Sequence, residues 1–158
     1  MITNIGKHRV QHGNIMDGVH MLMNGDKADL IYSDPPWGQG NLRYWKTINK
    51  RMTGDISTDV IYSEFLPFFF NMCFENSKDK VIIEYGCQWS KDIEDNAVKS
   101  GFTYQGKVIC YYGTGNNVRP CDIHFMTKSS TISFTDEFID LCKEKRDLNL
   151  VSYIFDYV

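Results

Sequence analysis

The sequence has no excess of positive charge. Its 17 lysines and arginines are outnumbered by 20 aspartates and glutamates, which gives a formal net charge of −3 and a sequence pI near 5.8. A protein that is held on nucleic acid by its overall field needs the opposite balance. Any contact with nucleic acid must therefore be local and made by a segment whose own charge is positive.

Cysteine pairs and long apolar runs are also missing. None of the 5 cysteines forms a C-x-x-C pair, so the sequence indicates neither a disulfide framework nor a zinc ribbon. The 4 histidines are scattered without metal-ligand spacing, and we expect no metal site. The most apolar run, Phe65 to Phe74, contains Pro67 and Asn71 and is too short to span a bilayer. We expect a cytoplasmic protein with reduced thiols and no membrane contact.

The chain is predicted to form a single domain over residues 1–158. Its length and its 42% content of hydrophobic residues suffice for a real core. Strand-like runs alternate with helical patterns, which favours an α/β fold. The expected strands are Arg9–His12, Ala28–Ser33, Lys80–Tyr85, a hairpin of Tyr104–Tyr112 and Asp122–Lys128, and Leu150–Val158. The expected helices are Gly18–Met23, Asp59–Cys73, Ser90–Lys99 and Phe134–Lys145.

The most specific feature is the tetrapeptide Asp34-Pro35-Pro36-Trp37. It follows the apolar run Ala28–Ser33, so it is predicted at the carboxyl end of a buried strand, where open α/β sheets bind ligands. Two consecutive prolines fix two φ angles and remove two backbone donors. The turn is therefore stiff, and its carbonyl groups can accept from a ligand. An amino group suits such a turn; an ordinary β-turn capped by an acid is the alternative.

This tetrapeptide resembles the signature of the S-adenosylmethionine-dependent amino-methyltransferases, in the branch that methylates N6 of adenine. The predicted order of elements is similar to the permuted arrangement of that family: the motif strand comes early, a strand like Val81–Ile83 follows, then a hairpin, and the methionine-binding strand comes last. The resemblance covers most of the chain. It implies a Rossmann-like methyltransferase sheet with helices on both faces, and S-adenosylmethionine as the cofactor.

The resemblance also implies roles for the four residues. The Asp34 carboxylate and the Pro35 carbonyl would accept from the two N–H groups of the adenine amine, within the turn that Pro36 helps to stiffen, while Trp37 stacks on the purine. Catalysis of this kind depends on positioning and on stabilising developing charge. Because the target atom is inaccessible inside a duplex, such enzymes extrude the base or use single strands.

Several further residues are implied to contact the cofactor. Gly13-Asn14 stands where these enzymes usually carry Gly-Asp, so the Asn14 amide is a candidate contact to the cofactor's adenine; an Asx-turn or a helix cap is the alternative. Asp34 is expected near the cofactor as well. The segment 113–123 resembles the loop and strand of RNA-type relatives, which makes Asn116 and Asn117 cofactor candidates, although Asp122 stands where glutamate is usual.

One departure from the family pattern concerns the cofactor site. Most permuted adenine methyltransferases carry a glycine-rich loop after the last strand, but this sequence has no glycine after Gly115. RNA-type relatives use polar residues beyond the same strand, and the sequence stops at Val158, where that strand is expected to end. Three explanations are open: a reading frame that stops early, a second chain that completes the cofactor site, or a degenerate fold that binds nucleic acid without transferring methyl groups.

A basic segment directly follows the tetrapeptide. Between Gly38 and Arg51 the sequence contains four cations and no acid, interleaved with aromatic residues. We expect a mobile loop that contacts phosphates and stacks bases; an ordinary solvated loop is the alternative. The predicted nucleic-acid residues are Arg43, Tyr44, Trp45, Lys46, Lys50 and Arg51, with Arg119 as a further phosphate contact.

Together these features predict transfer of a methyl group to the N6 amino group of adenine in nucleic acid. DNA is favoured over RNA, because the compact chain has no separate RNA-binding module and resembles small phage and bacterial modification enzymes. That resemblance implies the cytoplasm of a bacterial or phage-infected cell. The rival is a non-catalytic relative that binds nucleic acid or serves as a partner subunit. Methylation of a small molecule or a protein amide is a third possibility, which the basic aromatic segment disfavours.

Overall fold

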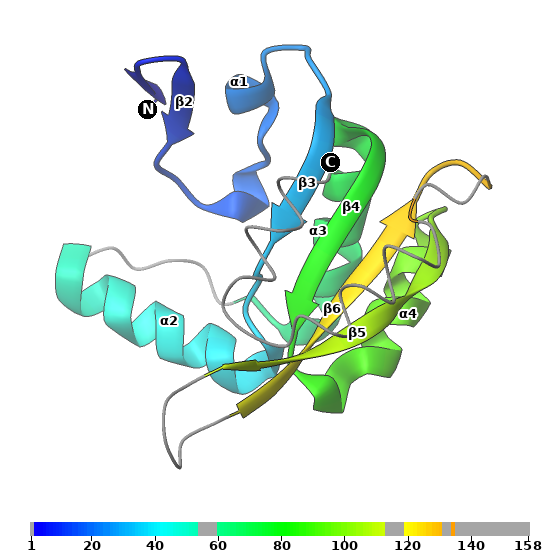
Figure 1. Cartoon of the computed structure of the whole chain (residues 1–158). Helices are drawn as coiled ribbons and strands as arrows, with labels where there is room; N and C mark the ends of the chain where they lie inside the picture. The colour runs from blue at the N-terminus through cyan, green and yellow to red at the C-terminus, as the bar shows by residue number, and fades with distance from the viewer. Residues whose placement is uncertain (1, 54–59, 113–118, 131–133, 135–158) are drawn as a thin grey trace.

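The computed structural model describes residues 2–53, 60–112, 119–130 and 134, and these form a mixed α/β fold (Figure 1). Its elements are β1 (Ile2–Ile5), β2 (His8–Gln11), the 3₁₀ helix η1 (Ile15–Asp17), α1 (His20–Met23), β3 (Ala28–Ser33), α2 (Gly38–Thr53), α3 (Tyr62–Asn76), β4 (Ser77–Tyr85), the 3₁₀ helix η2 (Cys87–Trp89), α4 (Ser90–Lys99), β5 (Thr103–Tyr112) and β6 (Arg119–Thr127). None of the described helices is long and apolar enough to cross a membrane.

The main sheet has four strands in the order β3-β4-β6-β5. Strands β3 and β4 are parallel, whereas β6 runs antiparallel to both of its neighbours. The α/β class, the strand Ala28–Ser33 and the hairpin of β5 and β6 are therefore confirmed. Because β3 and β4 are parallel neighbours, their carboxyl ends lie side by side at one edge of the sheet, and the register that pairs Ser33 with Ile83 places the residues after β3 beside the end of β4.

Helices α3 and α4 cover one face of this sheet (Figure 1). Alternate residues of β4, Val81, Ile83 and Tyr85, are fully buried and share a core cluster with side chains of both helices. The spacing of Phe65, Phe69 and Cys73 puts these residues of α3 on one side of the helix, and all three are buried. The apolar pattern of this stretch makes the helix dock on the sheet. The helix predicted at Asp59–Cys73 is thus confirmed as α3, with the bounds Tyr62–Asn76.

The opposite face of the sheet carries a second buried cluster. Its members include Ile82 of β4, Ile123 and Phe125 of β6, and Phe134, which is 1% exposed. Within the described residues, helices cover only the face of α3 and α4. The predicted helix Phe134–Lys145, apart from Phe134, and the predicted strand Leu150–Val158 lie outside the described residues, so the expectation of helices on both faces is confirmed for one face.

The predicted mobile loop after the tetrapeptide is wrong: this segment is the 16-residue helix α2. The physical reason is its side-chain periodicity. Leu42 and Ile48 are half-buried, whereas Arg43, Lys50 and Arg51 are exposed, so the segment has an apolar and a basic side when it winds as a helix. Its glycines, Gly38 and Gly40, stand in the first turn, so no glycine interrupts the rest of the helix.

The N-terminus forms a separate two-stranded sheet. The predicted strand Arg9–His12 appears as β2, shifted by one residue, and it pairs antiparallel with β1, which sequence reasoning did not predict. The tight connection places Gly6 at a φ of 59°, a backbone conformation that glycine adopts without strain. This hairpin lies on the β3 side of the main sheet (Figure 1).

Candidate functional site

The tetrapeptide Asp34–Trp37 forms the connection between β3 and α2, at the carboxyl end of the parallel pair. Tyr85, the last residue of β4, fixes this connection from the side. Its hydroxyl donates a 2.7 Å hydrogen bond to the carbonyl oxygen of Pro36 and accepts a 2.9 Å bond from the backbone N–H of Gly38. Tyr85 is fully buried, and burial is the first cause of the rise in its pKa, so the phenol stays protonated and keeps donating.

Two glycines allow a tryptophan to pack tightly beside the turn. A Cβ atom on Gly38 would lie 2.6 Å from the ring of Trp89, and a Cβ atom on Gly86 would lie 2.8 Å from the same ring and 3.1 Å from Trp37. Gly38 also has a φ of 73°, which a side chain would strain. The ends of β3 and β4 are therefore joined by Tyr85 and Trp89 through close contacts that only glycine permits.

Asp34 is exposed, and its carboxylate has a fixed partner. The indole N–H of Trp37 donates a 2.8 Å hydrogen bond to Oδ1 of Asp34. Desolvation, and then the negative charge of Glu84, raise the pKa of Asp34 above its ordinary value, while the bond from Trp37 opposes the rise. The indole orients this carboxylate, and its second oxygen is left to meet a ligand.

Glu84 is a functional candidate that sequence reasoning missed. It is 9% exposed on β4 and accepts a 2.7 Å hydrogen bond from the hydroxyl of Tyr32 on β3. Burial and then the bond to Glu84 raise the pKa of Tyr32 far above its ordinary value, so the phenol remains a donor. The signal in the sequence was an acid at the end of an otherwise apolar strand. Glu84 thus places a second carboxyl group near Asp34.

Trp37 is half-buried between the two core clusters. Its ring lies 6.3 Å from that of Tyr85 at an interplanar angle of 47°, while its N–H is committed to Asp34. The four tetrapeptide residues follow β3 directly, and Pro35 is buried. The predicted stacking of Trp37 on a purine is not tested by these contacts.

Of the described cofactor candidates, Asp34 lies in this turn, whereas Asn14 makes a local contact. Asn14 precedes η1, and its side-chain oxygen accepts a 3.0 Å bond from the backbone N–H of Met16, so it acts as the helix cap that was the alternative interpretation. Asn116 and Asn117 lie outside the described residues. Among the described residues, Asp34 is therefore the predicted cofactor residue whose carboxylate is exposed at the turn.

The predicted nucleic-acid residues lie on α2, except for Arg119, which is exposed at the start of β6. Arg43, Tyr44, Lys50 and Arg51 are exposed on α2, and Lys46 is half-buried. The side chain of Trp45 lies outside the described part. Because α2 begins directly after Trp37, the helix extends away from the tetrapeptide (Figure 1).

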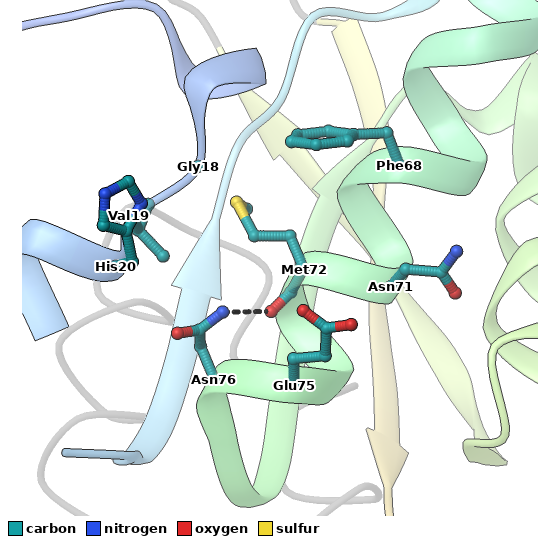
Figure 2. Close-up of a pocket in the computed structure, with 8 residues that line it drawn as sticks. All are labelled: Gly18, Val19, His20, Phe68, Asn71, Met72, Glu75 and Asn76. Atoms are coloured by element: carbon teal, nitrogen blue, oxygen red, sulfur yellow. Dashed lines mark hydrogen bonds between the residues drawn. The ribbon is translucent and has the colours of Figure 1, made fainter. Parts of the chain in front are cut away.

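A cavity of about 260 Å³ lies elsewhere, between the segment Gly18–His20 and α3. Figure 2 shows Val19 and His20 on one side and Met72, Glu75 and Asn76 on the other. Pockets for ligands of cofactor size usually hold about 300–1,000 Å³, and none of the lining residues belongs to the tetrapeptide. This cavity does not fit a methyl donor that must meet an amine at Asp34.

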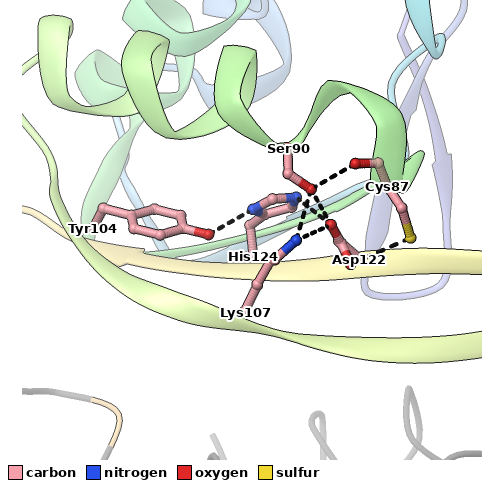
Figure 3. A network of polar contacts seen from close by, with 6 residues as sticks. All are labelled: Cys87, Ser90, Tyr104, Lys107, Asp122 and His124. Carbon is pink, nitrogen blue, oxygen red and sulfur yellow. Dashed lines mark hydrogen bonds and ion pairs between the residues drawn. The ribbon is translucent and has the colours of Figure 1, made fainter.

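A network of polar side chains lies under η2 and the start of α4 (Figure 3). Asp122 of β6 is fully buried and pairs with Lys107 of β5 at 2.6 Å. It also accepts hydrogen bonds from the Ser90 hydroxyl and, at 3.3 Å, from the Cys87 thiol. Burial alone would raise the pKa of Asp122, but the bonds from Lys107, Ser90 and Cys87 outweigh it and hold the pKa below its ordinary value.

His124 completes this network on the same strand. Its Nδ1 lies 2.8 Å from the Tyr104 hydroxyl and its Nε2 lies 4.0 Å from Asp122. Burial lowers the pKa of His124 to about 4, so the ring is neutral at pH 7. Sequence reasoning missed this network because its members come from separate elements. In the described residues, no group of three or more His, Cys, Asp or Glu side chains is placed to hold a metal ion.

No protein-family model matches this chain, and no curated protein matches it. The functional assignment therefore depends on the chemistry of the site.

Proposed function

We propose that this protein transfers a methyl group to the N6 amino group of adenine in DNA. The observation that carries the proposal is the tetrapeptide turn at the carboxyl ends of β3 and β4, with an exposed carboxylate at Asp34 that Trp37 orients at 2.8 Å. Open α/β sheets bind ligands at this edge. A ligand that reaches the turn meets acceptors, which selects for a donor such as an exocyclic amine.

The turn acts on the amine by orienting it. Oδ2 of Asp34 and the carbonyl oxygen of Pro35 accept from the two N–H groups, because Oδ1 of Asp34 is already bonded to Trp37 and the Pro36 carbonyl is bonded to Tyr85. S-adenosylmethionine supplies an electrophilic methyl group to this chemistry when it is bound. Positive charge that develops on the nitrogen is stabilised by the carboxylate, in a turn that is held rigid before the substrate arrives.

Helix α2 supports nucleic acid as the substrate and DNA over RNA. The whole chain is acidic, yet α2 contains four cations and no acid. The exposed Lys50 and Arg51 follow Arg43 by seven and eight residues, about two helical turns, so the three side chains share one side of the helix. The major groove of B-form DNA admits an α-helix, whereas the deep, narrow major groove of A-form RNA does not. A basic helix next to the catalytic turn therefore suits duplex DNA.

The test is a methyl-transfer assay with isotope-labelled S-adenosylmethionine and unmethylated DNA and RNA of the same sequence, followed by digestion and mass spectrometry. We expect N6-methyladenine in the DNA. The variant Asp34→Ala should lose about two to three orders of magnitude in rate, comparable to the loss of one oxyanion donor, and its circular dichroism spectrum should be unchanged. Near-wild-type turnover in Asp34→Ala would refute the role of this carboxylate.

A second candidate function is a non-catalytic protein that binds nucleic acid or serves as a partner subunit. It is favoured by the commitment of Asn14 to a helix cap and by the position of the described cavity away from the turn. Calorimetric titration with S-adenosylmethionine separates the two functions. Binding of the cofactor by this chain supports the enzyme, whereas DNA binding without cofactor binding or methyl transfer supports the non-catalytic protein.

A further inference from the structure

Trp89 connects η2 to the candidate site. It is the last residue of η2, its ring lies 6.0 Å from that of Tyr85 in an edge-to-face arrangement, and it fills the space that Gly38 and Gly86 leave. The ring leaves no room for a side chain at Gly38 or Gly86, so a shift of the ring toward the turn would displace Gly38. The position of Trp89 therefore determines the position of the turn.

Asp122 holds η2 on both sides of Trp89. Its Oδ1 accepts from the Cys87 thiol at 3.3 Å, and its Oδ2 accepts from the Ser90 hydroxyl. The same Ser90 hydroxyl contacts the carbonyl oxygen of Cys87 at 3.0 Å. One carboxylate thus binds the first residue of η2 and the first residue of α4 (Figure 3). Trp89 lies between these two residues in the sequence.

Asp122 is itself fixed to the sheet. It pairs across the strands with Tyr85, and its side chain is fully buried. Lys107 of β5 donates to Oδ2 of Asp122 at 2.6 Å and to the Ser90 hydroxyl at 2.8 Å. The carboxylate is therefore anchored by a charged partner on the neighbouring strand, which gives η2 a rigid support.

We propose that Asp122 is a positioning residue for the tetrapeptide turn: through Cys87 and Ser90 it fixes Trp89, and Trp89 fixes Gly38 and with it the orientation of Asp34. As a role in catalysis, this assignment rests on the proposed function. The coupling between Asp122 and Trp37 is a property of the folded chain and can be measured without any substrate.

The measurement is the indole N–H resonance of Trp37 in ¹⁵N-labelled full-length protein. The sequence has 3 tryptophans, and Trp→Phe variants assign the three signals. Because this N–H donates to Asp34, its chemical shift reports the geometry of the turn. We expect the signal to shift or broaden in Asp122→Asn and, to a smaller extent, in Ser90→Ala. An unchanged Trp37 signal in a folded Asp122→Asn or Ser90→Ala protein would overturn the proposal. If Asp122→Asn does not fold, Ser90→Ala alone decides.

Tyr104→Phe is the matched control. It removes a hydrogen bond of the same network, from the Tyr104 hydroxyl to His124, without touching η2. It should leave the Trp37 signal in place even where it lowers the unfolding midpoint. Transmission through Trp89 is tested by a double-mutant cycle: in a Trp89→Leu background, Ser90→Ala should cause no further shift of the Trp37 signal. Additive shifts would show that Trp89 does not carry the coupling.

Activity provides an independent readout. If the methyl-transfer assay is positive, Ser90→Ala should lower kcat, by up to about 100-fold for a misplacement of the order of 1 Å, with little change in KM, whereas Tyr104→Phe should leave both near wild type. If no methyl transfer is detected, the proposed function fails, but the resonance experiment still supports or overturns the positioning role. The two failures are therefore distinguishable.

Discussion

The hydroxyl of Tyr85 bridges the two ends of the candidate turn, since it donates to the carbonyl oxygen of Pro36 at 2.7 Å and accepts from the N–H of Gly38 at 2.9 Å. Two prolines remove backbone donors from this turn, so it cannot hold itself together by backbone hydrogen bonds alone. The buried hydroxyl of Tyr85, from the neighbouring strand, supplies hydrogen bonds that the turn cannot form within its own backbone. The rigidity of the site thus depends on tertiary contacts as well as on its own sequence.

The first prediction concerns Tyr85→Phe. The change keeps the ring in the core but leaves the buried N–H of Gly38 without its acceptor, which costs about 1–3 kcal/mol of unfolding free energy. We expect a loss of this size in urea unfolding, together with a lower kcat in the methyl-transfer assay. Tyr104→Phe, which leaves the turn untouched, is the control for the loss of a tyrosine hydroxyl. Full activity in Tyr85→Phe would show that the bridge is dispensable.

The second prediction concerns Gly38→Ala. Gly38 and Gly25 have positive φ values of 73° and 85°, so alanine at either position strains the backbone by about 1–2 kcal/mol. Only Gly38 meets a neighbour, the ring of Trp89 at 2.6 Å, whereas nothing lies within 4 Å of the Cβ position of Gly25. Gly38→Ala should therefore lower the unfolding free energy by more than Gly25→Ala. Equal losses in thermal or urea unfolding would contradict the tight packing of Trp89.

The sequence predicted the elements whose apolar pattern is local and strong. The strand Ala28–Ser33 and the helix Ser90–Lys99 have the predicted bounds, and the hairpin of β5 and β6 was placed correctly. Helix α2 was missed because the glycines near its start and its polar composition suggested a loop, and the half-buried Leu42 and Ile48 are a weak apolar signal.

The supports of the candidate site were less accessible to sequence reasoning. The tetrapeptide is contiguous, so its place at the end of β3 could be predicted. Tyr85, Trp89 and Asp122 support it from β4, η2 and β6, and only the pairing of these elements brings them together. Asp122 and His124 are fully buried in β6, where the other buried side chains, apart from Thr127, are apolar. Two polar residues at buried positions of one strand were the available signal, because buried polar groups require partners.

The third prediction concerns the basic side of α2. Replacing Arg43, Lys50 and Arg51 by glutamine should weaken DNA binding. It should also make the fall of log K with log salt less steep, by about 0.7–0.9 in slope for each phosphate that the helix no longer neutralises. The charge-matched control replaces three exposed lysines outside α2, Lys7, Lys27 and Lys99, and should leave the slope near wild type. Fluorescence anisotropy across a salt series measures both. The same slope in the α2 variant as in the wild type would exclude this helix as the phosphate-binding element.

The fourth prediction concerns acid stability. The folded state holds the pKa of His124 at about 4, below its ordinary value of 6.5, because the ring is buried. Below pH 6.5 the unfolded chain takes up a proton that the folded chain excludes, so the free energy of unfolding should fall between about pH 6.5 and 4, by up to roughly 3 kcal/mol. His124→Gln should remove this part of the pH dependence in urea unfolding, and His8→Gln, on the exposed β2, should not. Parallel profiles for His124→Gln and the wild type would contradict it.

The fifth prediction concerns the acid limb of activity. Desolvation and the charge of Glu84 raise the pKa of Asp34, and the role of Asp34 as an acceptor requires the ionised form. As the pH falls, methyl transfer should therefore decline at a higher pH than an unperturbed aspartate would give. Glu84→Gln removes the repelling charge but still accepts from Tyr32, so it should move the acid limb to lower pH.

Glu64→Gln, on the exposed first turn of α3, is the control and should leave the acid limb in place. Profiles of kcat/KM against pH measure the acid limb, and titration of the Trp37 indole N–H resonance reports the ionisation of Asp34 directly, because the two groups are hydrogen-bonded. If Glu84→Gln shifts the indole titration but not the kinetic profile, Asp34 ionises as described but is not the group that limits the reaction. If neither moves, Glu84 does not act on Asp34, and the pairing of the two carboxyl groups at the ends of β3 and β4 has no electrostatic consequence for the turn.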